Sequence, residues 1–358
     1  MRTRLTDLLG IEHPVMLAGM GGVSYSALAA AVSAAGGFGC LGASTMNNET
    51  MIEEMAAVRA ATDKPFGVDL LTAMPGGMTE QVKMVIEGGA SAFVAGLGVP
   101  TEVVDLCHEH DLVVVSMCGK VEHAVRAVEA GCDLVVAQGT EAGGHTGQVA
   151  SFPLVPQIVD AVGARVPVVA AGGIFDGRGL AAALAYGADG IAMGTRFLLT
   201  SESPVADAVK QAYLASDVTG TVVTARADGV PHRLLRTPLT ERLERAGRLS
   251  GLVRSARSAD AFRRASGLGW PALLREGGAM RRGTGLTWGQ VLMAANTPVL
   301  LRAAMADGHP EAGLMPSGQV AGLIDDLPSC ADLIARIMTD AEQRLSSLGK
   351  LAAPPGAG

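Results

Sequence analysis

One run of ten residues, QGTEAGGHTG at 138–147, contains the side chain with the clearest chemical potential. Its imidazole, His145, stands among glycines and comes soon after a short apolar run typical of a buried strand. A histidine titrates near neutral pH and can take or give a proton during a reaction. The pattern makes His145 the candidate catalytic residue, although a structural or solvated histidine fits the pattern alone equally well.

Glycines follow two later apolar runs at the same relative position. Gly172 and Gly173 follow one run, and Met193, Gly194 and Thr195 belong to the other. Glycine lets backbone N–H groups approach an anion closely, and such loops often hold a phosphate. We favour phosphate binding over the alternative that these glycines only permit tight turns.

Two earlier positions also suggest a ligand. Ala18, Gly19 and Met20 end the first apolar run, where the backbone could pack against a flat ring. Asp69, near the end of the third run, is either a ligand contact or a helix cap. No Ser–His–Asp order, glycosidase carboxylate pair or metal-binding spacing accompanies His145, so no metal site is predicted. The lack of a second strong polar partner favours a cofactor that carries the difficult step.

These residues lie at the ends of a repeating pattern. Over roughly the first 200 residues, eight short apolar runs occur, and helical patterns fill six of the intervals between them. The repeat predicts a (β/α)8 barrel over residues 1–204, with a doubly wound open sheet as the rival architecture. In a barrel the active site lies at the carboxyl ends of the strands. The apolar runs are 14–20, 38–42, 65–71, 92–98, 112–118, 134–139, 166–173 and 190–197.

Charge is spread unevenly along the 358 residues, whose net charge is −7. Residues 226–282 hold 13 arginines and 5 acidic residues, a net charge of +8. We predict an Arg-rich, mostly helical subdomain or lid over 205–317, then a loop and helix over 318–350 that pack back on the barrel, and a disordered tail at 351–358. The acidic total argues against a nucleic-acid partner.

The sequence also bears on location. No signal-peptide pattern precedes the barrel, and glycines interrupt the uncharged stretch 14–48, which argues against a membrane span. The five cysteines show no CxxC spacing and predict buried free thiols. We therefore expect a cytoplasmic protein without a membrane partner, and a homo-oligomer remains open.

Three motifs together resemble the nitronate monooxygenase-like flavoproteins, a family that includes FMN-dependent enoyl-ACP reductases and NADH:quinone reductases. The motifs are QGTEAGGHTG (138–147), PVVAAGGIFDGRGLAAALAYGADGIAMGTRFL (167–198) and GIEHPVMLAGMGG (10–22), and they cover the barrel. The resemblance implies one FMN at the strand ends, with its phosphate on Gly173, Gly194 and Thr195, Gln138 near the ring, and the residue matching His145 as the base. The implied cofactor-binding residues are Ala18, Gly19, Met20, Asp69, Gln138, Gly143, Gly144, Gly172, Gly173, Met193, Gly194 and Thr195.

Asp69 departs from that family's pattern, which usually has asparagine after the third strand. An amide both donates and accepts hydrogen bonds, whereas an ionised carboxylate only accepts. A carboxylate beside a flavin would disfavour the anionic reduced form by repulsion. Asp69 therefore puts the family's flavin contact at this strand in question.

The second half resembles a narrower actinobacterial branch, the flavin oxidoreductase of steroid ring C/D degradation. The matching stretches are GTVVTARADGVPHRLLRTPL (220–239), LTWGQVLMAANTPVLL (286–301) and SGQVAGLIDDLPSC (317–330). This resemblance implies a coenzyme A thioester as substrate and a nicotinamide donor.

Three functions follow from these patterns. The first is oxidation of alkyl nitronates by O2 through a flavin, with His145 as the base. The alternative is an NAD(P)H-dependent FMN reductase for an acyl-CoA or enoyl thioester, whose phosphates an arginine-rich lid would attract, with Arg226, His232 and Arg233 as candidate substrate contacts. The third is a non-catalytic flavin- or metabolite-binding protein, against which His145 in its open loop argues.

Overall fold

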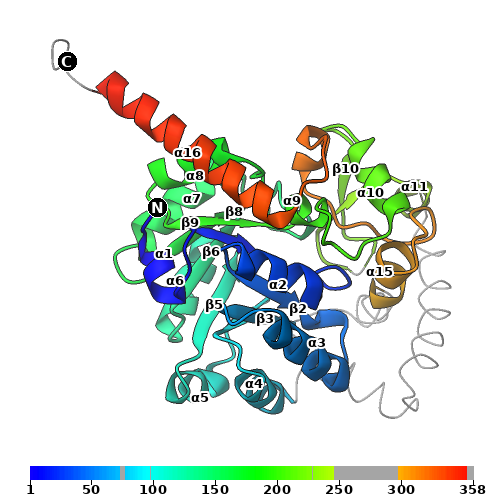
Figure 1. Cartoon of the computed structure of the whole chain (residues 1–358). Helices are drawn as coiled ribbons and strands as arrows, with labels where there is room; N and C mark the ends of the chain where they lie inside the picture. The colour runs from blue at the N-terminus through cyan, green and yellow to red at the C-terminus, as the bar shows by residue number, and fades with distance from the viewer. Residues whose placement is uncertain (73–76, 97, 228, 246–296, 353–358) are drawn as a thin grey trace.

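The computed structural model describes residues 1–72, 77–96, 98–227, 229–245 and 297–352 (Figure 1). Its centre is a sheet of eight parallel strands, one for each predicted apolar run. The strands are β1 (Val15–Leu17), β2 (Gly39–Gly42), β3 (Phe66–Leu70), β4 (Ala92–Ala95), β5 (Val113–Cys118), β6 (Leu134–Gln138), β8 (Val168–Ala171) and β9 (Gly190–Met193).

The sheet curls into a barrel. Its strand order is β1-β9-β8-β6-β5-β4-β3-β2, so the first strand pairs with the last, with Val15 opposite Ile191. A parallel bridge between Met16 and Phe38 joins β1 to β2 on the other side. The predicted (β/α)8 barrel is therefore confirmed, and the open doubly wound sheet is wrong.

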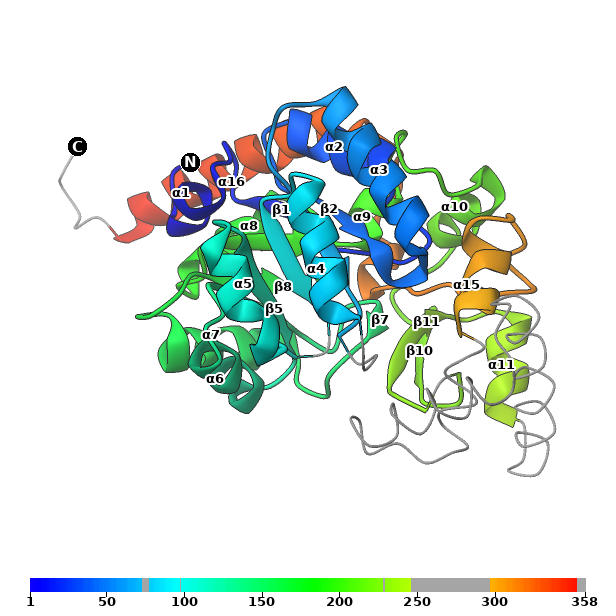
Figure 2. The same cartoon turned by 90° about the horizontal axis from the view of Figure 1, so that it is seen from below.

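Helices surround the barrel (Figures 1 and 2). They are α2 (Ser26–Ala34), α3 (Asn48–Ala61), α4 (Met78–Glu87), α5 (Val104–Glu109), α6 (Val121–Glu129), α7 (Ser151–Val162), α8 (Gly177–Ala185) and α9 (Thr195–Leu198), with short 3-10 turns at η1 (Ala43–Thr45) and η2 (Thr101–Val103). The helical patterns missed α7, which contains Pro153 and Pro156. Proline is tolerated in a first helical turn because that N–H has no intrahelical acceptor, but Pro156 lies further in and removes one bond.

The core has two layers because successive strand residues point to opposite faces. Val15 and Leu17 pack outward under the helices, whereas Met16 points into the barrel with Phe38 and Cys40. Helix α1 (Arg4–Leu9) adds Leu5 and Leu9 to the interior layer and so covers the amino-terminal end of the barrel. All five cysteines are buried and free, as predicted.

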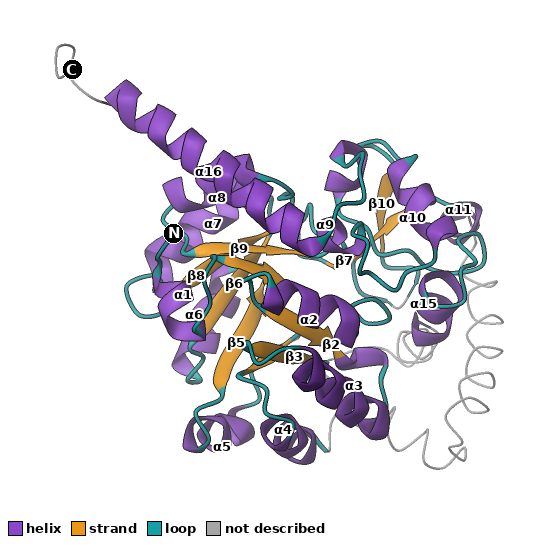
Figure 3. Cartoon of the chain, in the orientation of Figure 1, coloured by secondary structure: helices purple, strands orange, loops and turns teal. Residues whose placement is uncertain are grey.

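A second, three-stranded sheet lies beside the barrel (Figure 3). It consists of β10 (Thr221–Thr224), β11 (His232–Leu235) and the two-residue strand β7 (Gly144–His145), which belongs to the loop after β6. Helices α10 (Asp207–Leu214), α11 (Pro238–Arg245) and α15 (Thr297–Met305) accompany it. The sequence pattern gave helices but no strands for this region. Residues 246–296, the middle of the predicted arginine-rich lid, lie outside the described residues.

The chain ends on helix α16 (Cys330–Ala352), which follows the 3-10 turn η3 (Gln319–Leu323) and packs against α8 and α2. This agrees with the prediction that the segment returns to the barrel. The helix runs to Ala352, two residues into the predicted tail, and residues 353–358 are outside the described part. None of the described helices is both long and apolar enough to cross a membrane.

The close contact between α2 and β2 allows the packing of this helix on the barrel to be tested. A Cβ added at Gly39 would lie 2.0 Å from the Ala29 carbonyl oxygen, so Gly39→Ala must push the helix off the strand. We expect a loss of about 1–3 kcal/mol of unfolding free energy, measured by urea denaturation. The control is Gly349→Ala in α16, where nothing lies within 4 Å and stability should hold or rise by up to about 1 kcal/mol. Equal stability of the two variants would contradict this packing.

Candidate active site

The predicted site residues come together at the carboxyl end of the barrel. Five strands contribute them, as the fold requires of residues that follow parallel strands. Ala18 to Met20 follow β1, Asp69 lies in β3, Gln138 ends β6, Gly172 and Gly173 follow β8, and Gly194 and Thr195 follow Met193 of β9.

His145 lies on β7, and backbone pairing fixes its position. The register sets His145 opposite His232 and Gly144 opposite Arg233 of β11. The Gln138 side chain donates a hydrogen bond from Nε2 to the His145 carbonyl oxygen at 2.9 Å. The candidate base is therefore held from both sides, by the end of β6 and by the neighbouring strand.

His232 lies directly beside His145. The two ring centroids are 4.6 Å apart, with the planes tilted by 38°, and His232 is only 2% exposed. The sequence named both histidines for different roles but gave no reason to place them together. The antiparallel register of β7 and β11 makes them neighbours, because directly opposed residues present their side chains on the same face.

Arg233 braces the histidine loop. The residue is 8% exposed, and its guanidinium donates from Nε to the Thr140 carbonyl and from Nη1 to the Thr221 hydroxyl, both at 2.9 Å. Burial lowers the pKa of Arg233, while the charge of Glu141 acts in the opposite direction. Arg226 is half exposed, with Nε 3.8 Å from Glu244 Oε1. Substrate contact by either arginine stays a prediction.

Glu141 and Ser151 are site residues that the sequence pattern missed. The Glu141 carboxylate accepts from the Ser151 N–H at 2.9 Å and from its hydroxyl at 3.0 Å, at the start of α7. Ser151 Oγ also lies 2.8 Å from the Gly172 carbonyl oxygen. An acidic side chain ten residues before a helix start is no recognised cap signal, because caps are local in sequence. These contacts join the loops that follow β6 and β8.

The glycine turns have the geometry that only glycine adopts easily. Gly172 and Gly173 take successive left-handed φ values of 93° and 75°. A Cβ at Gly172 would lie 3.0 Å from the Gly139 carbonyl oxygen, and one at Gly194 would lie 3.1 Å from Met20 Sδ. These glycines therefore bring the loop after β8 close to that after β6 and the loop after β9 close to that after β1, and their role in phosphate binding remains a prediction.

A segment from the second half of the chain closes over these loops. The Gly318 N–H donates to Thr195 Oγ1 at 2.9 Å, and the Gln319 N–H donates to the Glu141 carbonyl at 3.0 Å. A Cβ at Gly143 would lie 2.7 Å from Gly318 N. Close packing against Gly318 is a sufficient reason for glycine at position 143. The cofactor contacts of Gly143 and Gly144 stay predictions.

Asp69 lies within β3, in register with Gly42 of β2 and Val94 of β4. It caps no helix, since α4 begins after Gly77, and the helix-cap alternative is wrong. A Cβ at Gly19 would lie 2.2 Å from Asp69 Cβ, and one at Gly96 would lie 3.3 Å from Oδ1. Burial raises the pKa of Asp69 to about 8. The raised pKa favours the protonated acid near neutral pH over the ionised carboxylate.

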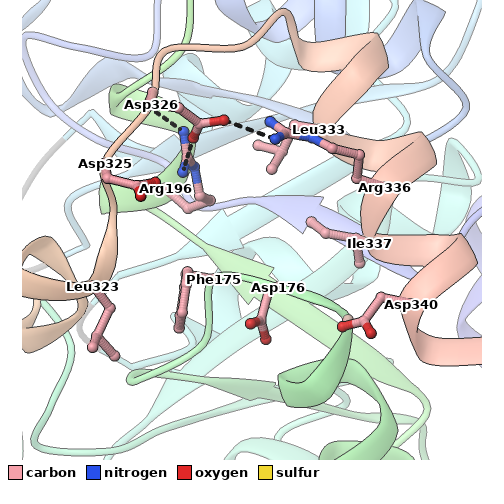
Figure 4. A pocket seen from close by; sticks show the side chains of 11 residues that line it. Phe175, Asp176, Arg196, Leu323, Asp325, Asp326, Leu333, Arg336, Ile337 and Asp340 are labelled. Atoms are coloured by element: carbon pink, nitrogen blue, oxygen red, sulfur yellow. Dashed lines mark hydrogen bonds and ion pairs between the residues drawn. The ribbon is translucent and has the colours of Figure 1, made fainter. Parts of the chain in front are cut away.

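A separate cavity of about 240 Å³ lies beneath α16, and none of the predicted site residues lines it (Figure 4). Arg196, 4% exposed, donates to Asp326 Oδ1 at 3.0 Å and to the Leu199 carbonyl at 2.7 Å. Arg336 of α16 donates to Asp326 Oδ2 at 2.7 Å. This shared carboxylate connects α16 to the start of α9, so we interpret the cluster as structural.

An eight-stranded parallel barrel with a histidine loop and glycine turns at its strand ends places the chain among the (β/α)8-barrel proteins, whose active sites lie at the carboxyl ends of the strands. The chain belongs to the nitronate monooxygenase family, whose sequence profile matches residues 2–81 and 72–340. It is thus a flavin-dependent oxidoreductase, in agreement with the predicted resemblance.

Two relatives match almost the whole chain, and both are called (3aS,4S,5R,7aS)-5-hydroxy-7a-methyl-1-oxo-octahydro-1H-indene-4-carboxyl-CoA dehydrogenase. The one from Mycobacterium tuberculosis H37Rv is 49% identical, over 98% of this chain and 99% of its own. The one from Rhodococcus jostii RHA1 is 45% identical, over 99% of each. Among solved structures, FabK from Thermotoga maritima has a TM-score of 0.78 at 34% identity, covering 98% of this chain and 99% of its own.

The raised pKa of Asp69 predicts how stability depends on pH. Between 3.8 and about 8 the folded protein keeps a proton that the unfolded chain has lost, so stability falls as pH rises through this window. The loss is at most about 1.4 kcal/mol per pH unit. Asp69→Asn should remove this component, making the variant more stable than the wild type at pH 8 but not at pH 4.

Urea denaturation at both pH values, with no ligand added, measures this difference. Asp63→Asn, at an exposed acid just before the same strand, is the matched control and should follow the wild type. If Asp69→Asn and the wild type lose stability in parallel from pH 4 to 8, the proposed protonation of Asp69 in the folded state is contradicted.

Proposed function

We propose that this protein is an FMN-dependent oxidoreductase that acts on the coenzyme A thioester of a fused-ring carboxylic acid, with His145 as the residue that moves the proton. The observation that carries the substrate class is the likeness to two dehydrogenases of a hydroindene carboxyl-CoA along 98–99% of this chain. That likeness includes the second half, which holds β10, β11 and the arginine-rich segment.

The strand ends are suited to FMN. Gly172 and Gly173 hold the left-handed conformation that turns backbone N–H groups toward an anion. We assign the phosphate to Gly173, Gly194 and Thr195. The Thr195 hydroxyl, which accepts from Gly318, still has its own proton to donate.

The ring is assigned to the loops after β1, β3 and β6. The Asp69 side chain lies directly against the Gly19 backbone, so the loop after β1 and the end of β3 meet closely at the position assigned to the ring. Met20 and Gln138 complete this contact. FMN, when bound, supplies the acceptor or donor for two electrons.

The histidine loop supplies the proton transfer. The backbone of His145 is held by the register with β11 and by the bond from Gln138 to its carbonyl oxygen. The neighbouring ring of His232 limits the positions that the His145 ring can take. A positioned imidazole contributes typically 10²–10⁴-fold to the rate of such a transfer.

The basic segment supports the choice of a coenzyme A substrate. Residues 226–282 carry a net charge of +8, and coenzyme A brings several phosphate charges. Arg226, at the start of this segment, stands on the same hairpin that pairs with the histidine loop. We propose that the hairpin brings the thioester to His145 while arginines hold the distant phosphates.

The family name supports a second candidate, oxidation of alkyl nitronates with O2. Fold, cofactor and catalytic histidine are shared by both candidates, so they differ only in the substrate and in what reoxidises or reduces the flavin. The nitronate candidate takes no account of the basic segment, and for this reason we place it second.

Anaerobic mixing separates the candidates. We expect the hydroindene carboxyl-CoA thioester to bleach the flavin absorbance of the purified protein, and propionate 3-nitronate to leave it unchanged. Bleaching by NADH or NADPH would instead indicate that the enzyme works as a reductase with a nicotinamide donor. Bleaching by the nitronate alone would make the second candidate the correct one.

Substitution of His145 tests the assigned base. His145→Ala should lower kcat/KM for the thioester by about 10²–10⁴-fold while the bound FMN content stays constant. His110→Ala, at an exposed histidine after α5, is the matched control and should keep full activity. Steady-state rates and flavin content measured together decide the matter, and full activity in His145→Ala would exclude the assigned role.

A further inference from the structure

Asp69 is an acidic residue whose surroundings do little to stabilise a negative charge. Its carboxyl lies between the Gly19 and Gly96 backbones, where added Cβ atoms would come within 2.4 Å of Oδ2 and 3.3 Å of Oδ1. In the described part of the chain, no group donates a hydrogen bond to this carboxyl. Asp69 is partly buried, so an ionised carboxylate there loses part of its hydration, and no described donor replaces that loss.

The surroundings add no positive charge. On β2, the titratable side chain that interacts with Asp69 is Cys40. Burial raises the pKa of the Cys40 thiol well above its usual range, so the thiol carries no charge. The residues paired with Asp69 on either side, Gly42 and Val94, carry no charge. From the loop after β1, Gly19 and Met20 contribute none either. Apolar and neutral neighbours favour the protonated carboxyl over the anion, in the same direction as the raised pKa.

We infer that Asp69 enters the cofactor site as an uncharged carboxylic acid that donates a hydrogen bond to an acceptor atom of the FMN ring, and that it loses this role only in alkaline solution. A protonated carboxyl has one O–H donor and one carbonyl acceptor, the same pair of functions as an asparagine amide. The inference rests on the proposed binding of FMN at the strand ends. It makes Asp69 a cofactor-positioning residue, with no proton transfer to substrate assigned to it.

An uncharged acid also resolves a conflict at this position. A permanent anion beside the flavin would oppose formation of the anionic reduced ring, whereas the neutral acid can hydrogen-bond to it. Ionisation above pH 8 removes the O–H donor of Asp69 and at the same time introduces charge repulsion between its carboxylate and the anionic reduced flavin. Flavin affinity and midpoint potential should therefore both change in the same pH range, and both depend on this one side chain.

FMN affinity of the flavin-stripped protein, titrated from pH 6 to 9.5, tests the inference. We expect wild-type affinity to be constant to about pH 7.5 and then to fall by roughly tenfold as the hydrogen bond is lost. Asp69→Asn should match the wild type at pH 7 and stay constant to pH 9.5. Asp69→Leu, which keeps the size but has no donor, should bind about five- to tenfold more weakly at every pH. Asp63→Asn should behave as the wild type.

The midpoint potential of the FMN-loaded protein gives a second readout. Wild type and Asp69→Asn should agree at pH 6.5, and the wild-type potential should fall below that of the variant above pH 8. A wild-type potential lower by the same margin at every pH would mean a permanent anion, and identical potentials throughout would mean no contact with the ring. Either result overturns the inference.

The wild type alone suffices if a variant does not fold. Infrared difference spectra of the holoenzyme between pH 6.5 and 9.5 should show the loss of one protonated carboxyl C=O band as FMN affinity declines. Affinity that does not change with pH, or no such band, overturns the inference. A protein that binds no FMN at any pH contradicts instead the proposed function, so the two failures are distinguishable.

Discussion

The two-residue ladder between β7 and β11 is the contact on which the site depends. The loop after β6 is rich in glycine, and fixing each such residue costs roughly 1–2 kcal/mol of conformational entropy. Pairing of Gly144 and His145 with Arg233 and His232 offsets this cost by hydrogen bonds and burial. Without it, the glycines that let the loop reach the barrel mouth would leave His145 free to move. The ladder therefore holds the loop that contains His145 in one position.

The same contact makes the barrel and the second half of the chain interdependent. Arg233 reaches across to the Thr140 carbonyl, while Gly318 and Gln319 bond to Thr195 and Glu141. Each bond joins a barrel loop to a segment far along the sequence. A barrel alone would contain the glycine turns and the histidine, but it would lack the partners that hold them.

Charge at the barrel mouth is limited in a way that suits a flavin. Arg233 is buried with Glu141 nearby, and Asp69 is held among glycines and apolar neighbours with its pKa raised. The strongly paired ions lie outside the mouth, as in the Arg196–Asp326–Arg336 cluster beneath α16. A site of low polarity strengthens each remaining hydrogen bond, which is how a few backbone and side-chain donors can orient a large ring.

The sequence by itself determined the parallel strands and their helices, because strands buried on both faces need apolar runs and parallel strands need intervening helices. It favoured the barrel over an open doubly wound sheet, and the pairing of β1 with β9 decided between them. It also identified His145, the glycine turns and Asp69, since strand ends in a barrel all face one way. It missed α7, whose prolines mask a helix, and the short strands β7, β10 and β11, whose pattern is too brief to distinguish from loop.

Only the tertiary structure decided how these residues act together. Contacts between distant segments place His145 beside His232, let Arg233 and Gly318 bond to the barrel loops, and raise the pKa of Asp69. Spacing along a chain encodes local periodicity, but a pKa depends on burial and a pair of rings depends on strand register. Both are properties of the packed molecule, because they are set by which atoms replace water around each group.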